Sequence, residues 1–158
     1  MEFWAEKEDY FRECLMEHGN HPRNRGGLKQ PTTCGVYQNP KTGDHIQVAL
    51  IVNKEIIQRA AFDGDGSLIA LASASMMTEY VAGKSVTQSL QTAQWIARAL
   101  RGECEIESLE KGAAELGELA SLLGVSKYPA RVSCALACWY ALDDALNHNK
   151  DDAMTPPR

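Results

Sequence analysis

The feature that most constrains this chain is one stretch of strand-like patterning in a sequence that otherwise repeats with helical spacing. Apolar residues alternate with other residues from Ile46 to Val52, and a second apolar run follows a tight turn at Asn53-Lys54. Two such runs joined by a short turn predict a β-hairpin over residues 45–62. Residues 32–37 look like a third short strand. We therefore expect a small three-stranded antiparallel sheet that needs helices to cover its apolar face.

Helical spacing accounts for most of the remaining sequence. Residues 21–31 are rich in Gly, Pro, Asn and Arg and are typical of an irregular loop. Ser85 and Gln88 have the spacing of a capping box, which marks the start of one helix. The expected helices are residues 3–18, a segment of small residues from Ala70 to Ser75 that leads into Met76–Val81, residues 85–101, residues 103–124 and residues 130–147.

Together these elements predict an α+β fold. We expect a single domain over residues 1–147, because no repeat or linker interrupts the pattern. Residues 148–158 carry charges and two prolines without any period, so we expect a disordered tail there.

Charge and composition exclude several classes of protein. Sixteen basic against twenty-one acidic residues give a net charge of -5, which argues against a nucleic-acid partner. No apolar stretch approaches the roughly 20 residues that span a bilayer, so we expect no membrane partner. The first residues are acidic where a signal peptide is positive, which favours a cytoplasmic protein. Five cysteines, an odd number, favour reduced thiols over a disulfide framework.

Three segments carry residues that could do chemistry. The loop Gly64–Ser67 lies between a strand and a helix, where backbone N–H groups can bind an anion, although a glycine turn chosen for positive φ is the simpler explanation. Asn39–Asp44 forms a second turn with a carboxylate at its end. Cys134 lies one turn inside a predicted helix, where the helix dipole should lower its pKa, or it is a small core residue.

In order along the chain, these segments resemble the U-type scaffolds of iron-sulfur cluster assembly, which include IscU, SufU and the N-terminal domain of NifU. The resemblance covers residues 10–146, and the roughly twenty residues between Gly102 and Gly124 resemble an insertion of the SufU branch. The matching residues are His18, Pro22–Asn24, Gly26, Asn39-Pro40, Gly43-Asp44, Phe62–Gly66, Ala72–Thr78, Gly83-Lys84, Gly124–Arg131 and Cys134-Ala135.

The resemblance implies a site that holds zinc or a nascent cluster with three cysteines and an aspartate. Asp44 and Cys134 match two of these positions, whereas Thr42 and Ser67 stand where the family has cysteines. Ser133 replaces the histidine of IscU-type members. Because alcohols stay protonated near neutral pH and cannot replace thiolates, we expect iron-sulfur or zinc binding to be weak or absent. Recruitment of Cys34, Cys138 or His45 as a replacement ligand is a weaker alternative.

Two functions follow from the resemblance, and the sequence leaves both open. Family members take sulfur from a cysteine desulfurase, and here Cys134 is the candidate acceptor, with Arg131 and Lys127 expected to favour its thiolate. Alternatively, the chain is an interaction or regulatory copy that docks the desulfurase without building a cluster. Both functions favour a scaffold or interaction protein over an enzyme, and the sequence leaves enzyme activity and self-association open.

Overall fold

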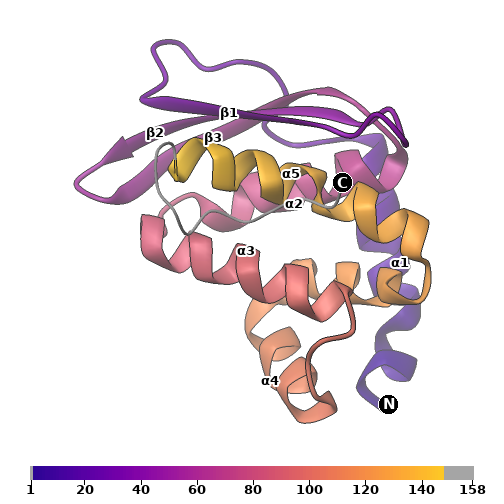
Figure 1. Cartoon of the computed structure of the whole chain (residues 1–158). Coiled ribbons are helices and arrows are strands. Elements are labelled where there is room, and N and C mark those ends of the chain that lie inside the picture. Colours follow the sequence, from indigo (N-terminus) through magenta and orange to yellow (C-terminus); the bar gives the residue numbers. More distant parts are fainter. Residues whose placement is uncertain (1, 148–158) are drawn as a thin grey trace.

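The computed structural model describes residues 2–147, with side chains from Lys7 onward. Figure 1 shows its elements in chain order. They are α1 (Glu2–Asn20), β1 (Thr33–Gln38), β2 (His45–Asn53), β3 (Ile56–Asp65), α2 (Leu68–Val81), α3 (Val86–Leu100), α4 (Ile106–Leu116), the 3₁₀-helical segment η1 (Gly117–Lys127) and α5 (Pro129–Leu146).

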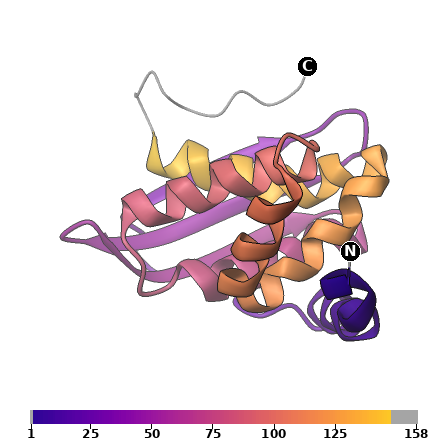
Figure 2. The same cartoon turned by 90° about the horizontal axis from the view of Figure 1, so that it is seen from below.

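The three strands form one antiparallel sheet in the order β1-β2-β3. β2 and β3 are joined by a two-residue turn at Lys54-Glu55, where both residues have positive φ (52° and 65°), as a tight hairpin requires. Ile46, Val48 and Leu50 are buried on the face of the sheet that α5 and α2 cover. Figures 1 and 2 show all the helices on this one face, which confirms the predicted architecture.

α5 lies very close to the sheet because β1 contributes a glycine at the crossing. A Cβ at Gly35 would fall 2.1 Å from the backbone oxygen of Ala141, so only glycine allows this approach. On the neighbouring turn of α5, the Thr33 hydroxyl donates to the backbone oxygen of Ala145 at 2.7 Å. This close packing fixes the position of α5, which carries Cys134, relative to the strands.

Other segments occupy both edges of the sheet. At the β3 edge, Gly26 N–H donates to Phe62 O at 2.7 Å and Phe62 N–H donates to Asn24 O at 3.0 Å. At the β1 edge, Val36 N–H donates to the carboxylate of Asp144 at 3.0 Å. These contacts satisfy edge groups that would otherwise be open to another strand.

The capping box predicted at Ser85 is confirmed, since Gln88 N–H donates to Ser85 Oγ and Ser85 N–H donates to Gln88 Oε1. Three predictions need correction. Residues 103–124 do not form one helix, because the chain turns at Gly117 with φ +60° and continues as η1. β3 runs to Asp65 and not to Phe62, because its pairing with β2 continues after the apolar alternation ends. The hairpin turn lies one residue later than predicted.

The predicted tail, residues 148–158, lies outside the described residues. Within them, no helix combines the length and apolar character needed to cross a membrane.

Candidate functional site

The turn between β1 and β2 directs Asp44 into the protein. Asn39 N–H donates to Asp44 O and Gly43 N–H donates to Asn39 O, each at 2.8 Å. Gly43 has φ +82°, a conformation that favours glycine. The turn leaves the Asp44 side chain only 1% exposed, so its carboxylate needs partners inside the protein.

Three groups from different parts of the chain donate hydrogen bonds to this carboxylate. The Thr42 hydroxyl donates to Asp44 Oδ2 at 2.8 Å, and the backbone N–H of Ser67 donates to Asp44 Oδ1 at 3.0 Å. The thiol of Cys134 is the third hydrogen-bond partner. The positions of Thr42, Asp44, Ser67 and Cys134 therefore meet, and we call these four residues the Asp44 cluster.

Ser67 also starts α2, because its hydroxyl accepts the backbone N–H of Ala70 at 3.2 Å as the N-cap. The preceding glycine makes the approach of Asp44 possible, since a Cβ at Gly66 would lie 2.6 Å from Asp44 Oδ1. The buried carboxylate thus lies at the positive end of the α2 dipole. The Gly64–Ser67 loop, which the sequence suggested as an anion site, therefore binds the carboxylate of Asp44 from the same chain.

The prediction of a low pKa for Cys134 is wrong. Burial and the hydrogen bond to the Asp44 carboxylate raise the pKa of this thiol, and the Ser67 hydroxyl only partly opposes them. Cys134 is the sixth residue of α5, beyond the first turn where the helix dipole acts. Arg131, which was expected to favour the thiolate, lies over the ring of Tyr128, with its guanidinium carbon 4.6 Å from the ring centroid.

None of the other cysteines completes a metal site. Cys138 is fully buried beside Ser73 Oγ at 3.3 Å, and burial raises its pKa to about 12. Cys34 is exposed on β1, and Cys14 is buried on α1. Among the described residues, no three His, Cys, Asp or Glu side chains lie close enough together to hold a metal ion. The donors of the Asp44 cluster are one carboxylate, one thiol and two hydroxyls, a set that does not fit zinc or an iron-sulfur cluster.

A second polar cluster, which the sequence did not predict, surrounds His18 at the junction of α1, α2 and η1. His18 is 3% exposed, with Nδ1 2.7 Å from Ser75 Oγ and Nε2 2.5 Å from Glu118 Oε2. Ser75 Oγ also accepts the backbone N–H of Arg23 at 2.8 Å. His18 and Ser75 belong to the matching motifs, but a lone histidine at helical spacing gives no indication of its partners.

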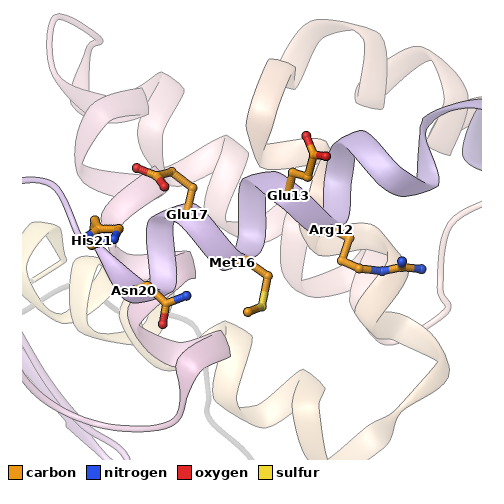
Figure 3. Close-up of a pocket in the computed structure, with 6 residues that line it drawn as sticks. All are labelled: Arg12, Glu13, Met16, Glu17, Asn20 and His21. Carbon is orange, nitrogen blue, oxygen red and sulfur yellow. The ribbon is translucent and has the colours of Figure 1, made fainter.

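A shallow hollow of about 480 Å³ runs along the surface of α1 (Figure 3). Its lining residues come from α1 and the residue that follows it. Figure 3 shows Glu13 and Glu17 pointing to one side of the helix and Met16 and Asn20 to the other. These side chains do not converge on a common point, so the hollow is not a candidate site.

The protein is a small α+β protein with its helices on one face of a three-stranded sheet. Its candidate site, the Asp44 cluster, is built from two loops and one helix. A family model described as the NifU-like N terminal domain matches residues 10–135. The chain therefore belongs to the NifU-like N-terminal domain family.

Relatives of this family support the assignment. The chain is 34% identical to the zinc-dependent sulfurtransferase SufU of Bacillus subtilis (strain 168) over 146 residues, which cover 92% of this chain and 95% of the relative. It is 33% identical to the iron-sulfur cluster assembly scaffold protein IscU of Streptococcus pyogenes serotype M1, over 85% of this chain and 81% of that one.

Solved structures agree with this fold. A putative iron-sulfur cluster assembly scaffold protein for the SUF system from Fervidobacterium islandicum AW-1 superposes with a TM-score of 0.76 at 25% identity, covering 85% of this chain and 94% of that one.

Proposed function

We propose that this chain acts in iron-sulfur cluster biogenesis by docking a cysteine desulfurase, without holding zinc or a cluster at the Asp44 cluster. Its family and its scaffold and sulfurtransferase relatives support the pathway. The observation that carries the proposal is that the Asp44 carboxylate already accepts hydrogen bonds from the Thr42 hydroxyl and from the backbone N–H of Ser67. At two of the family's thiolate positions, this chain carries side chains that cannot supply sulfur ligands.

The chemistry of the donor groups favours an Asp44 cluster that holds no metal. Zinc and iron-sulfur clusters select thiolates, and a hydroxyl remains protonated near neutral pH. A metal ion would also have to take the Asp44 carboxylate from its present donors, and a buried polar group that loses its partner costs about 1–3 kcal/mol. Because Cys134 is the one thiol in the cluster, metal–thiolate bonds would offset little of the free energy lost with the hydrogen bonds to Asp44.

Sulfur acceptance by Cys134 is the second candidate, and the retention of this thiol beside Asp44 favours it. The sulfur of Cys134 would attack the outer sulfur of a desulfurase persulfide, forming one S–S bond while another breaks. The electron pair of the broken bond, and the Cys134 proton, would go to the departing desulfurase cysteine. The raised pKa of Cys134 works against this step, because the thiolate is the reactive form.

One experiment with a cysteine desulfurase and cysteine separates the two functions. Binding is measured by size-exclusion chromatography or calorimetry, and sulfur uptake is measured by intact-mass spectrometry. Docking predicts a complex, no added sulfur on the wild-type chain and equal binding by Cys134→Ser. One added sulfur that Cys134→Ser abolishes would establish the acceptor function instead. Absence of any complex would overturn the docking proposal.

A further inference from the structure

We propose that the hollow between α2 and η1 binds a lysine or arginine side chain presented by a partner protein. This inference goes beyond the docking function, because the hollow shares no residue with the Asp44 cluster. The hollow has a volume of about 170 Å³. Its lining residues are the buried Met76, Leu116 and Leu119, the half-buried Tyr80, and the half-exposed Glu79 and Glu118.

The two glutamates at the rim carry more negative charge than their basic contact, His18, can neutralise. Their side chains are 50% and 51% exposed, and among the side chains described, those of residues 7–147, neither has a lysine or arginine partner within 4.0 Å. His18 is the nearby titratable base, with Nε2 2.5 Å from Glu118 Oε2 and 3.8 Å from Glu79 Oε1. One imidazole carries at most one positive charge, so the rim stays negative even when His18 is protonated.

Lys84, which contacts Tyr80 of the hollow, does not fill this role. Lys84 Nζ lies over the ring of Tyr80, 4.3 Å from the ring centroid, and forms no ion pair with either glutamate. Lys84 therefore leaves the carboxylate oxygens that do not contact His18 available to a cation from outside.

The segment that supplies Leu116 and Glu118 to the hollow is acidic. Residues 103–118, which include α4 and the start of η1, contain six glutamates and one lysine. Figures 1 and 2 show α4 on the side of the molecule away from the sheet. A concentration of one charge sign on a surface attracts partners of the opposite sign.

The shape and chemistry of the hollow select a basic side chain over a free metal ion. The long apolar stems of lysine and arginine pack on apolar surface while their charged ends reach carboxylates. The floor of Met76, Leu116 and Leu119 suits such a stem, and Glu79 and Glu118 suit the charged end. A hydrated metal ion would gain nothing from this floor, and the described residues offer no group of three ligands here.

The test uses N-acetyl-L-argininamide as the probe and N-acetyl-L-citrullinamide as its uncharged analogue of the same shape. Each is titrated into the ¹⁵N-labelled full chain and followed by NMR. We expect the arginine probe to shift the amides of Glu79, Tyr80, Glu118 and Leu119, and the citrulline probe to bind at least about threefold more weakly. Equal shifts from both probes, or shifts confined to other surfaces, would overturn the proposal.

Glu79→Gln is the test variant, because Glu118 holds His18 and its substitution could disturb the fold. We expect Glu79→Gln to weaken binding of the arginine probe about threefold, as loss of one exposed charge pair predicts. Asp65→Asn is the matched control, since Asp65 is 98% exposed and lies at the end of β3. It should leave binding unchanged. Unchanged binding by Glu79→Gln would also overturn the proposal, whatever the result of the desulfurase experiment.

Discussion

At the scale of single residues, the decisive feature is a fully buried carboxylate whose hydrogen-bond needs are met inside the protein. Asp44 accepts from Thr42, from the backbone of Ser67 and from Cys134. Hydrogen bonds to a charged acceptor are stronger than neutral ones. Thr42 therefore does more than remove a thiol from a ligand position, because its hydroxyl also stabilises Asp44 without a metal ion. Ser67 contributes its backbone N–H, which a cysteine at this position would also supply.

Because the four positions already meet, restoring the thiols should restore a metal site. We predict that Thr42→Cys combined with Ser67→Cys binds zinc at least about tenfold more tightly than either single variant, since thiolates are the ligands that zinc selects. Competition titration with a chromophoric chelator measures these affinities.

The wild-type chain, the two single variants and the double variant form a thermodynamic cycle whose coupling term reports whether the new thiols act together. Thr42→Cys with Cys34→Ser is a useful control, because it keeps the number of thiols at the wild-type value. If the double variant binds zinc no better than the wild-type chain, the four positions do not form a metal site.

Sequence alone predicted which residues occupy these positions but not their chemistry. The resemblance placed Thr42, Asp44, Ser67 and Cys134 at matching positions, and the structure brings them together. The pKa of Cys134 was predicted in the wrong direction, because it depends on burial and on a carboxylate 90 residues earlier in the chain. The partners of His18 were also missed, because Glu118 is separated from it by 100 residues.

At the scale of elements, the break between α4 and η1 depends on one glycine. Gly117 has φ +60° and ψ −129°, a combination that side chains disfavour. No atom lies within 4 Å of a Cβ built there, so the cost of a side chain is backbone strain alone. We predict that Gly117→Ala lowers the free energy of unfolding by about 1–3 kcal/mol, measured by urea denaturation.

Gly124→Ala in the same segment is the matched control. Its Cβ would also meet nothing within 4 Å, and its φ lies outside the left-handed region. We expect it to be neutral or slightly stabilising, because alanine reduces the entropy of the unfolded chain. Equal effects of the two substitutions would show that the conformation of Gly117 does not hold the break.

Element types followed from periodicity and capping, whereas some boundaries did not. The Ser85 cap and the hairpin could be predicted because they depend on residues a few positions apart in the sequence. The pairing of Asn24 and Gly26 with β3 could not be predicted, because residues 21–31 have no strand pattern. This segment joins the sheet through backbone atoms. The break at Gly117 was hidden because a Leu/Ala periodicity continues on both sides of it.

At the scale of the whole molecule, the fold has a source of stability that does not involve a metal. One hydrophobic cluster joins side chains of the strands, α2, α3, η1 and α5, and Trp139 lies fully buried within it. A chain of this size can bury about 70% of its unfolded surface. The Asp44 cluster ties the β1–β2 turn to α2 and α5 through hydrogen bonds. We therefore expect folding to be independent of zinc and iron.

The most direct test of this account is metal and labile-sulfide analysis of the full chain purified without oxygen, paired with thermal unfolding in the presence and absence of a chelator. We predict far less than one zinc or iron per chain, no labile sulfide, and the same unfolding temperature with and without the chelator. About one tightly held zinc per chain, with unfolding on chelation as structural zinc sites show, would contradict the account.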